Sequence, residues 1–169
     1  MHGQHPLQSK NHFTPLIAAS LSRGPVAYLE LDPFPHDCGA ECTFLGKTRA
    51  ETHPELGELI SIDYQVYAHM ATQILTQLAH EATDKFTCRA VRIVHATGPV
   101  HVAEASVLIQ TASPHRQQAF LATRHIIDQL KLSLPIWKQL VYQRGSTYPM
   151  GSPPQPLPSS PPNGTATPK

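Results

Sequence analysis

Residues 113–138, which read SPHRQQAFLATRHIIDQLKLSLPIWK, constrain the fold most strongly because they mark one helix at both of its ends. Ser113 is a favourable N-cap, and Pro114 suits the first helical position. Pro135 stops the helix, because proline cannot continue the backbone hydrogen bonding. The apolar residues that recur at helical spacing and predict its buried face are Ala119, Phe120, Ile126, Ile127 and Leu130. The sequence therefore predicts one amphipathic helix packed on a core.

Basic residues lie at both ends of this predicted helix. His115 and Arg116 fall in its first turn, beside backbone N–H groups that have no partner within the helix, which is a natural anion site. Lys131 and Lys138 come at the far end, where a cation also favours the helix dipole. Lys131 points well away from His115 around the helix axis, so one helix cannot gather these groups alone. Spacing indicates an anion-binding site, and a solvated basic face remains the alternative.

Several strings follow one another between residues 26 and 148, in the order GAECTFLGKTR, IDYQVYAHMA, SPHRQQAF, IDQLK and PIWK. Any one of them is a weak signal, but the ordered set is hard to produce by chance. Together they resemble the large, catalytic subunit of molybdopterin synthase, a sulfurtransferase of molybdenum cofactor biosynthesis. The resemblance implies a ubiquitin-like small subunit whose C-terminal Gly-Gly thiocarboxylate enters the large subunit's pocket. Two sulfur transfers then convert cyclic pyranopterin monophosphate into the dithiolene of molybdopterin.

The resemblance also implies which residues form the site. Lys131 in IDQLK and Lys138 in PIWK are expected nearest the reacting carbon, with electrostatic and acid–base roles. The residues expected to bind substrate are Arg49 and, as a weaker candidate, Lys47 in FLGKTR, with His115 and Arg116 in SPHR. Cations suit this chemistry because the pterin phosphate and the thiocarboxylate are both anionic. Phe44 and Trp137 are expected to pack the pocket wall.

The bulk properties favour one domain, and no cofactor is predicted. A chain of 169 residues with 40% hydrophobic residues supports one ordinary core, and a net charge of +1 gives no general attraction to nucleic acid. No apolar run approaches the roughly 18–20 residues of a membrane span, so a cytoplasmic protein is expected. Cys38, Cys42 and Cys88 are expected as reduced thiols. His36 with Cys38 and Cys42 lacks a second ligand pair at zinc-finger spacing, so no metal is predicted.

The composition divides the chain into three parts. A flexible arm is expected over residues 1–24, the molybdopterin synthase large-subunit domain over residues 25–148, and a disordered Pro/Ser-rich tail over residues 149–169. Pro-rich segments can bind SH3-like or WW-like partners, and an inert tail is the alternative that we favour.

Hydrophobic periodicity predicts an α+β fold within the central part. A helical stripe begins at Met70 and ends near Phe86, and the second helix is the one opened by Ser113. Strands are predicted over residues 26–31, 39–45, 61–67, 88–96 and 105–111, with a mobile loop over residues 46–57. The expected fold is an antiparallel-rich sheet packed with two main helices, of the α/β hammerhead-like kind.

The chain departs from the family pattern near its C-terminal end. Gln139, Leu140 and Val141 stand where the family commonly has a glutamate. Tyr148 replaces a tryptophan, and no arginine follows Arg144, although the family can lend such an arginine to the other protomer of a dimer. A homodimer within a heterotetramer with two small subunits is expected. The alternative is a non-catalytic subunit that still binds the small subunit or the pterin, with an unrelated anion-binding protein as a third possibility.

Overall fold

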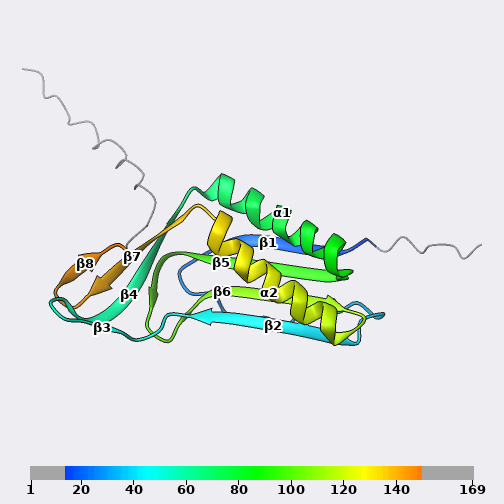
Figure 1. Cartoon of the computed structure of the whole chain (residues 1–169), viewed down its shortest axis with the longest axis horizontal. Helices are drawn as coiled ribbons and strands as arrows, with labels where there is room; N and C mark the ends of the chain where they lie inside the picture. The colour runs from blue at the N-terminus through cyan, green and yellow to red at the C-terminus, as the bar shows by residue number, and fades with distance from the viewer. Residues whose placement is uncertain (1–13, 150–169) are drawn as a thin grey trace, which may run out of the picture.

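A mixed sheet with two helices forms the part of the chain that the structure, a computed structural model, describes, which is residues 14–149 (Figure 1). Its elements are β1 (Leu16–Arg23), β2 (Ala40–Lys47), β3 (Thr52–His53), β4 (Gly57–Val66), α1 (Ala68–Phe86), β5 (Ala90–His101), β6 (Ala105–Ser113), α2 (Arg116–Ser133), β7 (Ile136–Tyr142) and β8 (Gly145–Thr147). The strand order is β2-β6-β5-β4-β7-β8, with β1 beside β5 and β3 beside β4. Only the β1–β5 pair within residues 14–149 is parallel. The predicted α+β fold with an antiparallel-rich sheet and two helices is confirmed.

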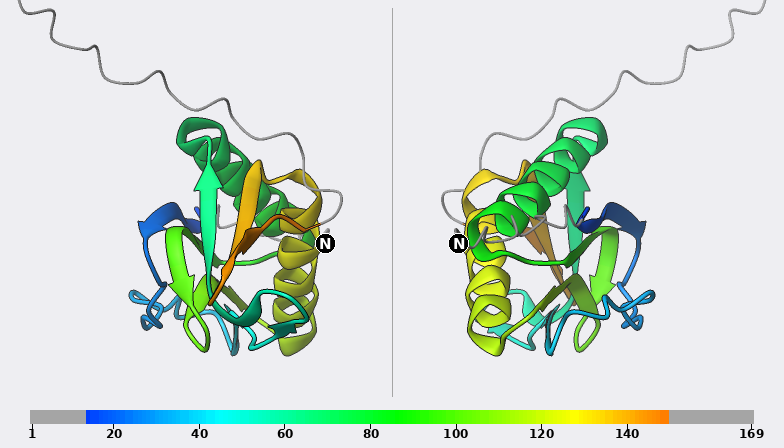
Figure 2. Two further views of the ribbon diagram at one scale, coloured as in Figure 1. Left: turned by 90° about the vertical axis from the view of Figure 1, so that its left-hand side faces the viewer. Right: turned by 90° about the vertical axis from the view of Figure 1, so that its right-hand side faces the viewer.

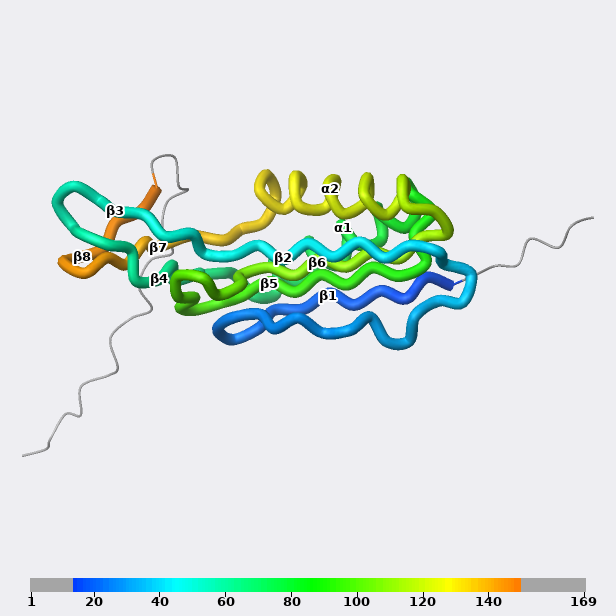
Figure 3. The backbone as a smooth tube through the Cα atoms, turned by 90° about the horizontal axis from the view of Figure 1, so that it is seen from below, coloured from blue at the N-terminus to red at the C-terminus, as the bar shows by residue number. Residues whose placement is uncertain are grey.

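Both helices cover the same face of the sheet (Figure 3). Leu75 of α1, Ile126 of α2 and Ile109 of β6 meet in the main core and have no exposed surface. Burying a side chain of this size contributes roughly 1.5–3 kcal/mol. No helix within residues 14–149 is long and apolar enough to cross a membrane.

The segment between β1 and β2 covers the opposite face of the sheet (Figure 3). Gln110 of β6 donates its side-chain amide to the carbonyl oxygen of Leu29 at 2.7 Å. Arg92 of β5 donates to the carbonyl oxygen of Glu30 at 2.8 Å. These bonds satisfy backbone groups of a segment that forms no strand, and they hold it against the sheet.

Strand β5 connects the two parts of the sheet. Its first half pairs with β1 and β6, whereas Gly98 and the residues after it pair with β4. Gly98 has φ +76°, a conformation that favours glycine, at the point where the strand changes partners. Strand β4 then pairs with β7 at one end of the sheet (Figure 2). This end lies next to the C-terminal end of α2 (Figure 1).

The first strand lies earlier in the chain than the sequence predicts. Residues 26–31 form no strand, which corrects the prediction there. Residues 16–23, expected to belong to the flexible arm, form β1 and pair with β5 along their whole length. The reason is that Ile17, Ala19 and Leu21 pack on the main core from alternate positions of this strand. Residues 1–13 and the tail from residue 150 lie outside the described residues.

The second helix begins later than its cap chemistry suggests. Ser113 is the last residue of β6, where it pairs with Ala40, and its hydroxyl donates to the sulfur of Cys88 at 3.3 Å. His115 occupies the N-cap position instead, with no side-chain capping bond. The prediction that Ser113 caps α2 is therefore wrong. The prediction that Phe120 lies on the buried face is also wrong, because its side chain is 61% exposed.

The remaining elements agree more closely with the sequence. Helix α1 and strands β2, β4, β5 and β6 occupy the predicted regions. The region expected as a loop over residues 46–57 contains the end of β2 and the short strand β3. Strands β7 and β8 follow α2 and were not predicted. Their presence matters for function, because β7 carries Lys138.

Candidate functional site

The end of α2 places Lys131 beside the sheet. Leu130 is 5% exposed and packs in the main core, and Lys131 follows it in the last turn of the helix. Leu134 ends the helix, and its N–H donates to the carbonyl oxygen of Leu130 at 3.1 Å. Pro135 then separates α2 from β7, as the sequence predicts.

Strand β7 places Lys138 opposite Tyr64 of β4. The ammonium nitrogen of Lys138 lies 5.9 Å from the centroid of the Tyr64 ring. The side chain is exposed to solvent, but partial desolvation by the surrounding protein lowers the pKa of Lys138, and the charge of Lys131 lowers it further. A lysine of this kind gives up its proton more readily than an isolated one, which suits proton exchange.

The end of β2 supplies a second pair of cations, Lys47 and Arg49. The pairing of β2 with β6 is irregular between Gly46 and Lys47. The segment is then held by backbone bonds, because the N–H of Thr48 donates to Glu104 at 2.9 Å and its carbonyl accepts from Ala103 at 2.9 Å. The backbone that carries Lys47 and Arg49 is therefore held in place where β2 ends.

These cations meet in one cavity of about 410 Å³, which we call the cationic pocket. Its four basic residues are Lys47, Arg49, Lys131 and Lys138. The apolar part of its wall consists of Phe44, Ile62, Val107, Ile127, Leu130, Leu134 and Ile136. No carboxylate of residues 14–149 lines the pocket or pairs with the four cations. The volume lies within the roughly 300–1,000 Å³ of small-molecule sites, and the charge selects an anion.

His95 lies in the wall of the cationic pocket, on β5. Its side chain is 9% exposed, and its ring packs edge-on against Tyr64 with centroids 5.4 Å apart. Burial lowers the pKa of His95, the hydrogen bond to Ala96 opposes this lowering, and the charge of Lys138 adds to it. Sequence alone does not single out His95, because a histidine in a strand carries no pattern that separates a structural residue from a residue of the site.

Two hydroxyl residues of the pocket were also missed. Thr48 is 3% exposed, and its Oγ1 has no hydrogen-bond partner within residues 14–149. Ser106 is 8% exposed and its Oγ lies 3.5 Å from the carbonyl oxygen of Gly46. A buried hydroxyl without a partner destabilises the protein, because it has given up its hydrogen bond to water. A bound ligand can replace that bond. Only the fold reveals this, because threonine between Lys47 and Arg49 is unremarkable in sequence.

Of the two aromatic residues expected in the pocket wall, one lies there and the other does not. Phe44 lines the cationic pocket and is 37% exposed. Trp137 does not line it, because its side chain, 6% exposed, packs edge-on against Tyr67 with ring centroids 5.1 Å apart. Neighbouring residues of a strand point to opposite faces, so Trp137 and Lys138 cannot both face the pocket.

His115 and Arg116 lie at the other end of α2, in a separate cavity of about 520 Å³ shared with Gln117 and Phe120. From Arg116 to Lys131 the helix rises about 22 Å at 1.5 Å per residue. Within one chain the structure therefore brings Lys47, Arg49, Lys131 and Lys138 together, and it does not bring His115 and Arg116 to them.

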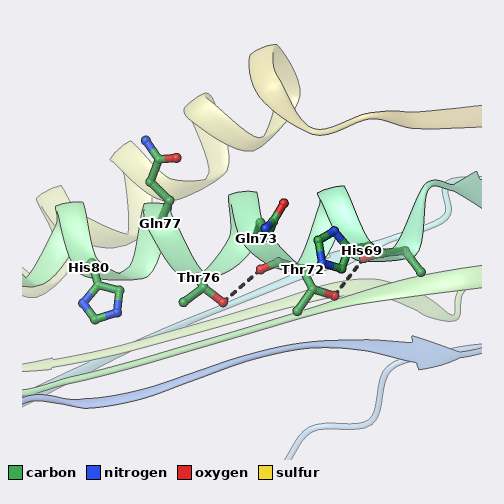
Figure 4. Close-up of a pocket in the computed structure, with 7 residues that line it drawn as sticks. His69, Thr72, Gln73, Thr76, Gln77 and His80 are labelled. Atoms are coloured by element: carbon green, nitrogen blue, oxygen red, sulfur yellow. Dashed lines mark hydrogen bonds between the residues drawn. The ribbon is translucent and has the colours of Figure 1, made fainter.

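A further hollow of about 640 Å³ follows the exposed side of α1 (Figure 4). Its lining comes from this helix alone and contains no acidic residue, lysine or arginine. The hydroxyls of Thr72 and Thr76 turn back to the helix and donate to Ala68 and Thr72 carbonyl oxygens, each at 2.9 Å. The hollow therefore lacks the charges that the cationic pocket gathers from three elements of the fold.

Comparison with known proteins identifies close counterparts of this chain. Residues 21–133 match the family model described as MoaE protein. The molybdopterin synthase catalytic subunit of Homo sapiens is 34% identical over 131 residues, which cover 78% of this chain and 67% of that protein. The molybdopterin synthase catalytic subunit of Bacillus subtilis is 32% identical over 112 residues, covering 66% of this chain and 70% of that protein.

Solved structures show the same fold. The crystal structure of molybdopterin synthase from Staphylococcus aureus has a TM-score of 0.69 at 27% identity, covering 77% of this chain and 95% of that chain. A complex of subunits 1 and 2 of molybdopterin-converting factor from Helicobacter pylori has a TM-score of 0.65 at 20% identity, and the match covers 78% of this chain and 90% of that chain.

The fold and these relatives define a class: the molybdopterin synthase catalytic subunits, sulfur-transferring enzymes of molybdenum cofactor biosynthesis. Since the family model matches most of the chain and the relatives exceed 30% identity, the chain belongs to the MoaE protein family. The family and the enzyme class predicted from the sequence are confirmed. The match to the family model ends at Ser133, before the strand that carries Lys138.

Proposed function

We propose that this chain transfers sulfur from the thiocarboxylated C-terminus of a ubiquitin-like small subunit to cyclic pyranopterin monophosphate, which forms the dithiolene of molybdopterin. The observation that carries the proposal is the cationic pocket, in which four basic residues gather in a MoaE fold with no carboxylate from residues 14–149. Both reactants are anionic, one through a phosphate and the other through a thiocarboxylate. Charge-assisted hydrogen bonds from lysine and arginine bind such groups more strongly than neutral ones.

Lys131 and Lys138 are proposed to act at the reacting carbon. They lie on α2 and β7 and contribute to the same pocket. Both lysines line the same pocket, and the charge of Lys131 lowers the pKa of Lys138. Preorganised cations stabilise negative charge that develops during the transfer, and a lysine with a lowered pKa can also donate a proton and recover it.

Lys47 and Arg49 are proposed to hold the phosphate from the other side of the pocket. They follow β2, whereas the two lysines come from α2 and β7, so a bound anion lies between cations of separate elements. Thr48 lines the same pocket, and its buried hydroxyl has no partner within residues 14–149, so rotation of the side chain would let it donate to the phosphate or the pterin.

His115 and Arg116 are proposed to reach the substrate only in an assembly. They lie about 22 Å along α2 from the lysines, so they serve the pocket of a second copy in the expected homodimer. Mixed dimers test this step. Inactive Arg116→Ala and Lys131→Ala chains, mixed in equal amounts and allowed to exchange, are expected to regain about a quarter of the wild-type activity, because about half of the dimers are mixed and one pocket of each mixed dimer is complete. No recovery from fully exchanged dimers would contradict it.

The proposed partner is a ubiquitin-like protein ending in Gly-Gly, with two copies bound to a dimer of this chain. The Helicobacter pylori structure with the same fold is a complex of two different subunits, which supports a hetero-oligomer. An extended tail can enter the pocket with its terminal anion facing the cations. The cytoplasm is the proposed compartment, because Cys38, Cys42 and Cys88 are free thiols.

Reconstitution tests the proposal. The purified chain is mixed with a thiocarboxylated small subunit and cyclic pyranopterin monophosphate, and dithiolene product is followed. Lys131→Ala and Lys138→Ala are each expected to lower the rate about 100-fold or more, as when a transition-state donor is removed. Lys85→Ala is the matched control, because Lys85 lies at the end of α1 and packs over Phe86, outside the pocket.

Two outcomes separate the proposal from its alternative. Near-wild-type turnover by either pocket variant contradicts the assignment of the lysines. Absence of product from the wild-type chain, together with stable binding of the small subunit, supports a non-catalytic binding subunit. The replaced glutamate at Gln139–Val141 keeps that alternative relevant.

A further inference from the structure

His95 is a buried titratable residue of the cationic pocket with no assigned role. It pairs with Leu21 of β1 and Val107 of β6, two neighbours that carry no charge. Its side chain reaches the pocket from the sheet, beside the ring of Tyr64, which Lys138 approaches from β7. The imidazole is therefore held in place by the strand on one side and by an aromatic ring on another.

One hydrogen bond determines the tautomer of His95. Nδ1 lies 2.9 Å from the carbonyl oxygen of Ala96. A carbonyl oxygen only accepts, so Nδ1 carries the proton and donates it. In the neutral ring Nε2 then has a free lone pair, and it has no hydrogen-bond partner within residues 14–149. Nε2 is thus an acceptor left open in the pocket wall.

The surroundings of His95 keep this acceptor unprotonated. Burial and, to a smaller extent, the charge of Lys138 lower its pKa from 6.5, and the bond to Ala96 only partly offsets them. The other charged or titratable groups of the pocket are Lys131 from α2, Lys47 and Arg49 after β2, and Tyr64 from β4. None of these is a carboxylate that would stabilise the imidazolium. The ring is neutral at pH 7 among several cations.

The proposed function needs such an acceptor. When the sulfur of a thiocarboxylate replaces an oxygen substituent on a pterin carbon, a carbon–sulfur bond forms, a carbon–oxygen bond breaks and the oxygen leaves with the electron pair. The small subunit then remains attached through an acyl–sulfur bond. Release requires water to add to the acyl carbon, after which the carbon–sulfur bond of the acyl group breaks. The small subunit leaves as a carboxylic acid, which loses the second proton of the water to the solvent, and the sulfur stays on the pterin as a thiolate. The proton lost by the water needs a base. A lysine that keeps its proton to stabilise the anions cannot accept it, whereas the open nitrogen of a neutral imidazole can.

We propose that His95 is the general base of this release step: its Nε2 accepts the proton of the water that cleaves the acyl–sulfur bond between the small subunit and the pterin. The inference rests on the proposed sulfur transfer. It divides the work of the pocket between cations, which bind the anions and stabilise charge, and one neutral group, which takes up a proton.

His95→Asn is the sharpest test, because the asparagine amide can keep the donation to Ala96 in the place of Nδ1 while Nε2 is lost. Single-turnover reactions with thiocarboxylated small subunit and cyclic pyranopterin monophosphate are quenched and measured by intact-protein mass spectrometry. The variant is expected to form the covalent small subunit–pterin adduct at a rate within about threefold of wild type. Its decay should slow about 100-fold or more, as when a general base is removed.

The pH dependence gives a second readout that a structural role would not change. The base must be unprotonated, so the wild-type decay rate should rise with pH below about 6.5 and level off once His95 is neutral. His95→Asn should show no such rise. His125→Asn is the control, because His125 of α2 packs on Phe86 of α1, outside the pocket, and its loss should leave decay unchanged.

The outcomes separate the two proposals. Wild-type protein that forms neither adduct nor product refutes the sulfur transfer itself. Wild-type turnover with unchanged adduct decay in folded His95→Asn refutes the role of His95 alone. If His95→Asn and His95→Gln both fail to form the adduct while remaining folded, His95 serves substrate binding and the general-base assignment is overturned.

Discussion

The close approach of β2 to β6 at Gly46 predicts that Gly46→Ala destabilises the protein. A β carbon at position 46 would lie 2.6 Å from Cγ1 of Val107 and 3.2 Å from Cε1 of Phe44. Carbon atoms in ordinary contact are about 3.5–4.0 Å apart, so the first approach is too short by about 1 Å. Val107 is 6% exposed and lies on β6, between β2 and β5. Its side chain has one rotatable bond and little space to turn, so the new contact has to be relieved by a shift of β2.

The expected cost follows from this overlap. Extra carbon atoms in a packed interior typically cost about 1–3 kcal/mol. For a chain of this size that corresponds to a fall in Tm of roughly 2–12 °C. The effect should also reach the cationic pocket, because the irregular pairing after Gly46 directs the segment that carries Lys47 and Arg49. A raised apparent substrate constant is therefore expected along with the lower stability.

A double-mutant cycle measures the overlap directly. Urea unfolding is compared for wild type, Gly46→Ala, Val107→Ala and the double variant. Val107→Ala removes the atom that the new β carbon meets, so the double variant should be more stable than the sum of the single effects by at least about 1 kcal/mol. Stability of Gly46→Ala within about 0.5 kcal/mol of wild type, or additive effects in the cycle, would refute the packing argument.

Three further predictions concern the pocket and the tail. Lys131→Met should raise the pKa of Lys138, because it removes a like charge that lowers it; unchanged NMR titration of Lys138 would contradict this. Thr48→Val should raise the apparent substrate constant roughly 2- to 10-fold without loss of stability, since it removes a buried hydroxyl that has no partner within residues 14–149; an unchanged constant would argue against a contact with the substrate. A chain ending at Met150 should keep its rate and substrate affinity within about threefold, because the tail is rich in Pro and Ser; a tenfold weaker affinity with the dimer intact would show that the tail serves the site.

Local patterns predicted the long elements and failed where distant pairing decides. The segments over residues 16–23 and 26–31 both alternate, so each can form a strand. Only residues 16–23 pair with β5, in parallel and with residues about seventy positions away in the sequence. The local sequence does not indicate which of the two segments forms this pair. Ser113 shows the same limit. Its cap chemistry favours a helix start, but pairing with Ala40 in the sheet takes precedence.

The candidate site was predictable to the extent that its residues are charged. Motif resemblance singled out Lys47, Arg49, Lys131 and Lys138, and the structure gathers them in one cavity. Spacing alone could not do this, because Lys138 depends on β7, which carried no clear pattern, and on its pairing with β4. His115, with Arg116 after it, resembles the same family motif but lies at the opposite end of α2.

The neutral residues of the pocket escape sequence reading for a physical reason. A lysine is basic wherever it lies, but a histidine becomes a free acceptor only when burial keeps it neutral and a neighbour holds its other nitrogen. The backbone of β5 supplies that neighbour for His95 through Ala96. A pocket whose cations all keep their protons binds two anions tightly and offers the released proton no acceptor. Turnover therefore depends on a group that the fold creates, and the protonation state of His95 should govern release more than binding.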